Sequence, residues 1–350
     1  KSREMGLGSY PDVSLSDARQ LSFNNKQLLS KKIDPIDEKN RVEVLRQQQN
    51  KKFSNIADLY IKTKKLPEWT NAKSYQSWKN TLNTYASPIL DNKPLIDINH
   101  DDIINVLLPI WTQKTETARR LQQRLFLIFS FAKIRGWYKN DNPASWKEHL
   151  IHILPDPYKI QNIKHFPSLH YTHISQFYSQ LCEFKFLSVY ALRLLILTAT
   201  RTKEVIESQF DEFDLQKKVW TIPADKMKVR KKHKVPLSDE AISIIELMRK
   251  KHNHEYVFTN PATGRHISNG AMLIFLKKQF PLLKITVHGF RSSFRDWAEE
   301  IGQYQHNAIE FCLAHELPNK VEKAYLRSDL IDARTIIMND WEKYLLSNLA

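Results

Sequence analysis

Cysteine is almost absent from this 350-residue chain, which holds only Cys182 and Cys312. Two isolated cysteines provide neither a disulfide framework nor a cysteine-based metal site, so we expect a reducing, cytoplasmic environment. Long hydrophobic runs are also missing. The longest, residues 189–199, is too short to span a bilayer and contains Arg193, so it predicts a buried helix. No signal peptide or internal repeat is visible, and because the chain opens at Lys1 rather than methionine we expect residues upstream.

Clustered metal ligands are scarce as well. Asp211, Glu212 and Asp214 make the nearest approach to a carboxylate cluster, in a segment that predicts the loop before a strand. We interpret them as a solvated acidic turn. A metal-dependent nuclease is therefore disfavoured, and we expect neither a metal nor another cofactor.

Positive charge is what the chain has in excess. Lysine and arginine number 53 against 38 aspartates and glutamates, which gives a formal net charge of +15. An excess of this size favours a polyanionic partner and binding that weakens with salt, although basic soluble proteins are common and charge alone leaves nucleic acid an open choice. The length favours two or three domains, and a hydrophobic content of 42% is enough to give them real cores.

Apolar residues recur at helical spacing in four stripes between residues 53 and 145. We predict four helices packed as a bundle. Any one basic residue on this bundle is better explained as part of a solvated helix face, but as a group they favour contact with a polyanion. The group for which we predict that contact is Lys73, Lys79, Arg119, Arg120 and Arg124.

The C-terminal half predicts a mixed domain. Residues 219–223 and 234–237 favour two strands around a basic turn, with helices before and after them. The last helix, residues 329–346, carries Trp341 and Leu345, which can pack on their own domain or on a neighbouring protomer. The fold class is thus mainly α with a small β-sheet, a helical bundle followed by a mixed α+β domain. Further predicted polyanion contacts on the turn are Arg230, Lys231 and Lys232.

Two arginines stand in settings suited to binding a phosphate. Arg201 follows the buried helix, and Glu204, three residues on, can pair with it or orient it. His288 and Arg291 are one helical turn apart, so their side chains share a face. A guanidinium can hold two phosphoryl oxygens in fork geometry, and a histidine beside it can carry a proton.

A tyrosine follows these residues in the sequence. Tyr325 comes ten residues after His315, and a phenolic hydroxyl placed in an electropositive site can attack phosphorus. Tyr304 is the rival nucleophile, but it precedes His315. A lysine on the turn between the two strands can protonate a departing oxygen, and Lys226 and Lys228 are the candidates there.

The ordered set Arg-x-x-Glu, Lys, His-x-x-Arg, His and Tyr resembles that of the tyrosine recombinases, and the flanking residues are most similar to integrases of phage-type and genomic-island elements. One departure is Ala314, because the family usually has glycine before this histidine. The resemblance implies a remnant of the N-terminal integrase domain, a helical core-type DNA-binding domain, an interdomain linker and a catalytic domain, at residues 1–48, 49–147, 148–169 and 170–350 respectively.

The resemblance also implies an activity, that of a site-specific DNA recombinase. Tyr325 would form a covalent 3′-phosphotyrosine, with Lys228 as general acid and His288 assisting proton transfer. The transition state would be bound by Arg201, Arg291 and His315, with Glu204 in a supporting role. A type IB topoisomerase and a non-catalytic DNA-binding regulator are the alternatives; the integrase-like N-terminal segment favours the recombinase over the topoisomerase.

The partners implied by the resemblance are double-stranded DNA at attachment sites, further copies of the chain in a homotetramer on DNA, an excision (directionality) factor and a DNA-bending protein. No membrane is expected, and the location would be the cytoplasm, with the nucleoid. The biological role would be integration and excision of a mobile element such as a prophage or genomic island. Whether the target is a tRNA gene, and which direction is preferred, stay open.

Overall fold

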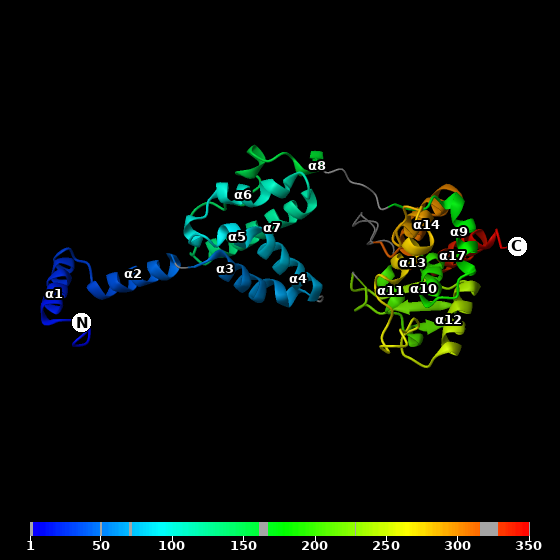
Figure 1. Ribbon diagram of the computed structural model, residues 1–350, viewed down its shortest axis with the longest axis horizontal. Helices are drawn as coiled ribbons and strands as arrows, with labels where there is room; N and C mark the ends of the chain where they lie inside the picture. Colours follow the sequence, from blue (N-terminus) through cyan, green and yellow to red (C-terminus); the bar gives the residue numbers. More distant parts are fainter. Residues whose placement is uncertain are drawn as a thin grey trace. The chain divides into compact units, whose positions relative to one another are not determined.

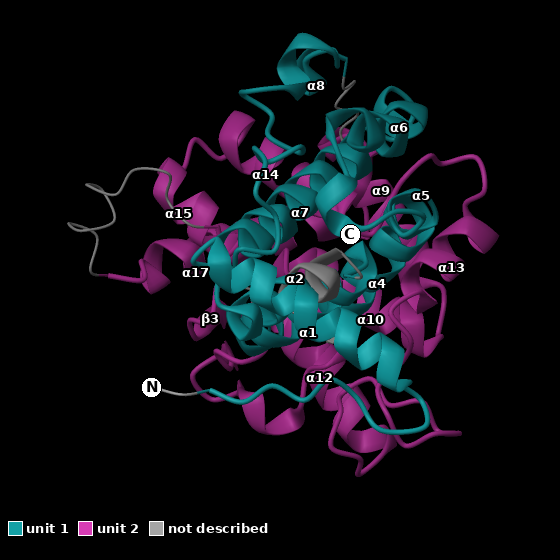
Figure 2. Cartoon of the chain, turned by 90° about the vertical axis from the view of Figure 1, so that its left-hand side faces the viewer, with its two compact units in different colours: residues 1–163 teal, residues 164–350 magenta. Residues whose placement is uncertain are grey.

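The computed structural model divides the chain into two compact units, residues 1–163 and 164–350 (Figure 2). Each unit has its own hydrophobic core. The structure describes residues 3–49, 51–69, 72–160, 167–227, 229–315 and 328–349. It is mainly helical with one small sheet, which confirms the predicted fold class. Within the described ranges, none of the helices combines the length and the apolar character that crossing a membrane requires.

Two helices open the first unit (Figure 1), α1 (Leu15–Ser30) and α2 (Pro35–Gln49). A capping box starts α1, because the Ser14 hydroxyl accepts from the Asp17 backbone N–H at 3.2 Å and the Asp17 carboxylate accepts from the Ser14 N–H at 3.3 Å. Pro35 occupies the first turn of α2, where proline is well tolerated. Asp34 caps that turn by accepting from the Ile36 N–H at 2.8 Å.

A helical bundle follows. Phe53, Leu107 and Leu125 lie fully buried at its centre. α3 and α4 each continue into a π-helical turn, at Ile61–Lys65 and Leu82–Ala86. The helices are α3 (Phe53–Tyr60), α4 (Ala72–Thr81), α5 (Ser87–Leu90), α6 (His100–Trp111), α7 (Thr115–Ile134) and α8 (Pro157–Ile160).

Part of the segment expected as a linker packs on this bundle. Leu150 and Leu154 are buried in the bundle core. The Trp111 indole N–H donates to the carbonyl of Pro155 at 2.9 Å, and its ring stacks on Trp146 with 5.6 Å between centroids. The packed unit therefore extends beyond residue 147, because two leucines and a tryptophan anchor the chain that leaves α7.

The second unit combines a three-stranded antiparallel sheet with helices (Figure 1). Its strands, in the order β1-β2-β3, are β1 (Phe213–Asp214), β2 (Val219–Ile222) and β3 (His233–Pro236). Trp220 pairs with Val235, and Ile222 with His233, so these four side chains share the face of the sheet that is turned to the core. The helices are α9 (Ile174–Cys182), α10 (Leu187–Thr198), α11 (Thr202–Ile206), α12 (Asp239–Lys251), α13 (Ala271–Gln279), α14 (Gly289–Glu300), α15 (His306–Cys312) and α17 (Ile331–Leu346).

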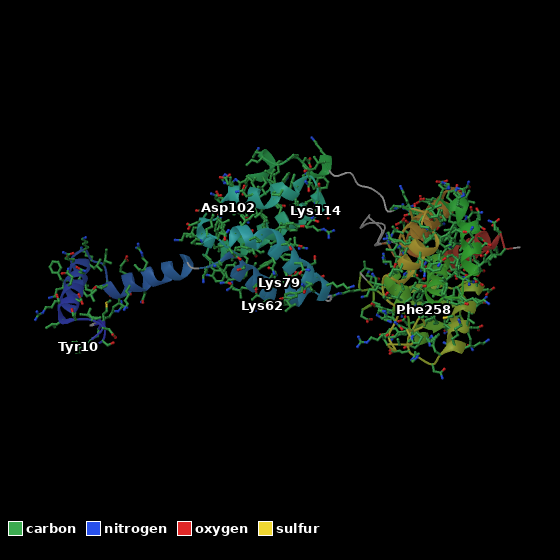
Figure 3. The ribbon with its side chains drawn as sticks, in the orientation of Figure 1. Tyr10, Lys62, Lys79, Asp102, Lys114 and Phe258 are labelled. Atoms are coloured by element: carbon green, nitrogen blue, oxygen red, sulfur yellow. The ribbon has the colours of Figure 1, made fainter. Side chains whose placement is uncertain are left out.

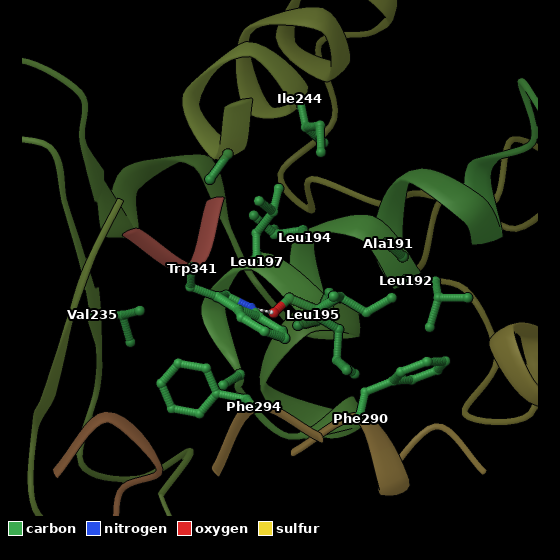
Figure 4. Close-up of a cluster of buried hydrophobic side chains, with 14 of the residues drawn as sticks. Ala191, Leu192, Leu194, Leu195, Leu197, Val235, Ile244, Phe290, Phe294 and Trp341 are labelled. Carbon is green, nitrogen blue, oxygen red and sulfur yellow. Dashed lines mark hydrogen bonds between the residues drawn. The ribbon is translucent and has the colours of Figure 1, made fainter. Parts of the chain in front are cut away.

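The central helix α10 is covered by α17. Trp341 of α17 is fully buried and donates its indole N–H to the carbonyl of Ile196 at 2.8 Å (Figure 4). Leu345 is fully buried too. These two side chains of the last helix therefore pack within their own domain.

Candidate active site

Arg201 stands between two helices, as the residue that precedes α11. Glu204, only 4% exposed, accepts from the Arg201 backbone N–H at 2.7 Å and from its Nη1 at 2.8 Å. The second terminal nitrogen of Arg201 donates to the carbonyl of Ala314 at 3.3 Å. The carboxylate thus fixes the direction of the guanidinium, which is the pairing that the Arg-x-x-Glu spacing indicated.

Arg291 is as deeply buried as Glu204, at 4% exposure. Its guanidinium donates to the carbonyl of Ala199 through Nη1, and to the carbonyl of Leu313 at 2.5 Å through Nη2. Burial, and after it the charge of Arg201, lowers the pKa of Arg291 to about 10. The group stays cationic at neutral pH, and a phosphate bound beside it would add negative charge that opposes the effect of burial.

Two alanines in the left-handed conformation present carbonyls to these arginines. Ala199 ends α10 with φ 49°, and Ala314 follows α15 with φ 50°. Their carbonyls accept from Arg291 and Arg201 respectively. This conformation explains why glycine suits the position before the histidine, since a Cβ is disfavoured at positive φ.

His288 precedes the first turn of α14, directly before Gly289. A side chain at Gly289 would come within 2.4 Å of the Pro167 carbonyl, so only glycine lets the start of α14 lie against that backbone. Burial, and then the charges of Arg291 and Arg201, lower the pKa of His288. A neutral imidazole keeps a lone pair that can accept a proton, which a general base requires.

His315 connects the arginine pocket to a buried carboxylate. Its Nδ1 lies 2.8 Å from Oε2 of Glu310, and its Nε2 lies 3.2 Å from Nη2 of Arg291. Glu310 is 9% exposed, and Nε of Arg295 lies 3.1 Å from its other oxygen. Burial lowers the pKa of His315, and the hydrogen bond with Glu310 opposes that effect.

Two charged or titratable residues beside this pocket were missed by the sequence interpretation. His233 on β3 faces Arg201, Arg291 and Arg334; burial, followed by those charges, lowers its pKa to about 3. Its Nε2 is buried with no hydrogen-bond partner among the described residues. Strand alternation could have found His233, because it falls two residues before the inward-facing Val235.

Arg334 was missed for a different reason. It is 2% exposed and lies in the first turn of α17, where its guanidinium donates to the carbonyls of Asp329, at 3.3 Å, and Lys234. It thereby ties the start of α17 to β3. A single arginine in a helical stripe carries no sequence signal for such a tie, since its partners are backbone carbonyls.

The predicted lysine and tyrosine, Lys228 and Tyr325, lie outside the described residues. Their rivals are both engaged elsewhere. The Lys226 ammonium donates to Glu212, to the Gln209 side chain at 3.1 Å and to a backbone carbonyl at 2.8 Å. The Tyr304 hydroxyl donates to Asp340 at 2.8 Å, and burial followed by that bond raises the pKa of Tyr304 to about 12.

Glu212 is not part of a solvated acidic turn. It is buried, and it accepts from Lys226 and from the indole N–H of Trp220 at 2.8 Å. That interpretation was wrong for Glu212 because its side chain faces the sheet. Asp214 does lie on the surface, where its carboxylate accepts from the Lys217 N–H at 2.9 Å.

The basic residues predicted to contact a polyanion differ in their settings. Arg124 is buried, and donates to the Ser77 carbonyl at 2.9 Å while its guanidinium lies over Trp78. Lys79, on the bundle (Figure 3), pairs with Asp58 at 2.7 Å. Arg119 and Arg120 both pair with Glu116, and the exposed members of the group are Lys73, Arg120, Arg230, Lys231 and Lys232. Packing explains Arg124 without any ligand.

One group of metal-ligand type occurs among the described residues. Glu299, His306 and Glu310 offer ligand atoms within 4.8 Å of one another. Nε of Arg295 lies 3.2 Å from Glu299 and 3.1 Å from Glu310, so a guanidinium already neutralises both carboxylates. The arrangement is that of an ion-pair network around Arg295.

Comparison with known proteins defines the class. Residues 168–330 match the phage integrase family, residues 53–149 the phage integrase central domain, and residues 1–42 an arm DNA-binding domain. The protein is a site-specific DNA recombinase of the tyrosine class, and the alternatives of a topoisomerase or a non-catalytic regulator are not favoured. The chain belongs to the phage integrase family.

Individual relatives agree with this assignment. The chain is 29% identical over 350 residues to prophage integrase IntA of Escherichia coli (strain K12), across 97% of this chain and 81% of that protein. It is 27% identical over 373 residues to the integrase of Enterobacteria phage P4, across 99% of this chain and 81% of that protein. A lambda integrase dimer bound to a COC′ core site has the same fold, with a TM-score of 0.62 at 15% identity over 93% of this chain and 89% of that one.

Proposed function

We propose that this recombinase cleaves and rejoins DNA through Tyr325. The observation that supports the proposal best is the convergence of Arg201, Arg291, His288 and His315 at the ends of α10, α14 and α15. Arg291 contacts His315 at 3.2 Å, and Arg201 contacts the carbonyl of Ala314, the residue before His315, at 3.3 Å. Cations and imidazoles gathered in one pocket, with a tyrosine ten residues along the chain, suit a phosphodiester substrate.

The proposed cleavage step exchanges one phosphate ester for another. The Tyr325 oxygen attacks phosphorus, the bond from phosphorus to the 5′ oxygen breaks, and a 3′-phosphotyrosine forms. His288 accepts the phenolic proton and Lys228 protonates the departing 5′ oxygen. Arg201, Arg291 and His315 stabilise the charge on the phosphoryl oxygens, and Glu204 orients Arg201. Attack by the 5′ hydroxyl of a partner strand reverses the step and exchanges strands.

The assignment of Lys228 and Tyr325 draws on their rivals. Lys226 is held by Glu212 and its neighbours, so releasing it to a leaving oxygen would leave a buried carboxylate without its cationic partner. Tyr304 is bound to Asp340 and has a raised pKa, which disfavours its phenolate.

We further propose that the enzyme acts as a homotetramer on paired attachment sites in double-stranded DNA, to integrate and excise a mobile element. A solved relative of the same fold is a lambda integrase tetramer bound to a Holliday junction, with a TM-score of 0.62 at 15% identity. The proposed helpers are an excision factor and a DNA-bending protein, and the proposed location is the cytoplasm, at the nucleoid. The exposed cations Arg230, Lys231 and Lys232 are the described residues best placed to meet the DNA backbone.

A plasmid assay tests this function. Supercoiled plasmids would carry either one or two copies of the junction sequence of the element that encodes the chain. We expect recombined circles only from the two-site plasmid, with the wild type and with Tyr304→Phe, and none with Tyr325→Phe. Relaxation of the one-site plasmid without recombination of the two-site plasmid would overturn the proposal in favour of topoisomerase activity.

A further inference from the structure

The two ring nitrogens of His315 contact groups of opposite hydrogen-bonding character, one an acceptor and the other a donor. Nδ1 lies 2.8 Å from the Glu310 carboxylate, an acceptor, so Nδ1 carries a hydrogen. Nε2 lies 3.2 Å from Nη2 of Arg291, which is always a donor. A neutral His315 satisfies both contacts, because an imidazole with its proton on Nδ1 has a lone pair on Nε2. In the DNA-free pocket Nε2 is therefore an acceptor.

A phosphodiester reverses the requirement at Nε2. Phosphoryl oxygens only accept hydrogen bonds, so His315 can contact one only if Nε2 also carries a hydrogen. With Nδ1 still donating to Glu310, the ring must then be the imidazolium, with a hydrogen on both nitrogens. Arg291 is at the same time released from Nε2 and can turn that N–H to the phosphate.

We propose that Glu310 is a positioning residue that enables His315 to take up one proton from solvent as a phosphodiester enters the pocket, so that His315 binds it as an imidazolium. This inference rests on the proposed function. The proton adds to Nε2, no other bond forms or breaks, and the new charge lies between the Glu310 carboxylate and the phosphate. Glu310 holds the ring orientation before and after the uptake.

The charges around the pocket show why a dedicated carboxylate is needed. Burial disfavours the protonation of His315, and the charges of Arg291 and Arg201 do so as well. Glu204 is already engaged by Arg201 through two hydrogen bonds, so Glu310 is the carboxylate in contact with the ring. Among the described residues, the titratable and charged groups that face the pocket are His288 directly before α14, Arg291 and Arg295 on α14, Arg201 and Glu204 at α11, Glu310 on α15, His233 on β3 and Arg334 on α17.

A purely structural role for Glu310 makes a different prediction. Its second oxygen lies near Arg295, and that contact could simply hold α15 against α14. Loss of such a contact would slow catalysis by the same factor at every pH. Loss of the charge that stabilises the imidazolium would instead slow catalysis more as pH rises, because the bound His315 would release its proton at lower pH.

The test compares Glu310→Gln with Glu299→Gln. Both changes replace a carboxylate partner of Arg295 by an isosteric amide, but only Glu310 contacts His315. Single-turnover cleavage of a nicked suicide duplex would be measured from pH 6 to pH 9. The quantity compared is the wild-type rate divided by the variant's rate at each pH. In this ratio the titration of groups that both proteins share cancels.

We expect the wild-type to Glu310→Gln ratio to rise by about tenfold or more between pH 6 and pH 9, as for a pKa lowered by about one unit or more. The ratio for Glu299→Gln should stay flat. Glu310→Asp, which keeps the charge, should restore most of the wild-type profile. In a His315→Gln background, where a side-chain amide donates without titrating, Glu310→Gln should add no pH dependence.

Two results would overturn the inference. A Glu310→Gln ratio that is constant with pH, or a pH dependence that persists in the His315→Gln background, would show a structural role. Absence of a covalent product from the wild type at every pH would instead refute the proposed function, and the inference with it.

Discussion

Arg291 lies at the centre of the pocket and also packs it, since it donates to the carbonyls of Ala199 and Leu313. Arg291→Ala should raise the cleavage barrier by roughly 3 kcal/mol or more, the expected loss for one donor to a charged transition state, while duplex binding largely survives. Arg291→Lys keeps the positive charge but loses the forked N–H donors of the guanidinium. It therefore separates the effect of charge from that of hydrogen-bond geometry. Suicide-duplex cleavage and a band-shift assay would measure the two effects. Loss of binding by a variant that still folds would contradict the assigned role.

His233 makes stability depend on pH. Its pKa is lowered to about 3 in the folded chain, whereas an unfolded histidine titrates near 6.5, so below that pH only the unfolded state takes up the proton. Stability should therefore fall as pH drops from about 7 towards about 3, with His233 accounting for about 2 kcal/mol at pH 5.

Urea unfolding at pH 7.5 and pH 5 would check this for wild type, His233→Asn and the control His254→Asn, whose side chain is exposed. The loss on acidification should shrink in His233→Asn only. An equal loss in all three proteins would place the pH dependence elsewhere.

The residues of the pocket were predictable where two side chains of suitable chemistry stand about one helical turn apart in the sequence. The Arg201–Glu204 pair follows from a three-residue spacing, and the shared face of His288 and Arg291 from one helical turn. Glu310 was not predictable as a partner of His315, because an acidic residue in a short helix looks solvated until α14 packs beside it. The carbonyl partners of the arginines were hidden for the same reason, since they arise only from tertiary contacts.

At the scale of elements, α17 completes the core of the second unit. Trp341 packs against Phe294 and Trp297 of α14 with ring centroids 5.5 and 4.8 Å apart, in addition to its bond to Ile196. Trp341→Ala should destabilise this unit by about 3–5 kcal/mol through the cavity it leaves. Trp341→Phe should cost about 1–2 kcal/mol, chiefly the lost hydrogen bond. Chemical denaturation followed by circular dichroism would measure both.

Ile336 provides the control on the same helix. Its side chain is exposed, so Ile336→Ala should change the free energy of unfolding by no more than about 0.5 kcal/mol. If Trp341→Ala were as mild as this, α17 would not be part of the core.

Helix bounds were largely predictable because apolar periodicity and flanking breakers agree. The sequence predicts helices at residues 239–250 and 271–280, and the structure has α12 at Asp239–Lys251 and α13 at Ala271–Gln279. The start of α2 was not predicted, because Pro35 is ambiguous in the sequence. A proline ends a helix that precedes it, but it is also common in the first turn of a helix that follows. The packing of Leu150 and Leu154 on the bundle escaped it as well, since few apolar residues there recur at regular spacing.

At the scale of the whole molecule, two units with separate cores share one chain of net charge +15. The pocket arginines, the histidines and the exposed turn Arg230–Lys232 all belong to the second unit, so the proposed chemistry is contained in one domain. The first unit holds the matches to the integrase central and arm DNA-binding domains. We propose that it contributes DNA binding, for which a positive chain is suited.

The central claim is that Tyr325 becomes covalently attached to DNA, and covalent trapping tests it most directly. Wild type, Tyr325→Phe and Tyr304→Phe would each be mixed with a nicked suicide duplex carrying the element's own junction, with chelator present, and run on a denaturing gel. The account predicts a shifted band for wild type and Tyr304→Phe and none for Tyr325→Phe, although a band-shift control shows that all three bind. An adduct that persists in Tyr325→Phe, or DNA binding by wild type without any adduct, would contradict it.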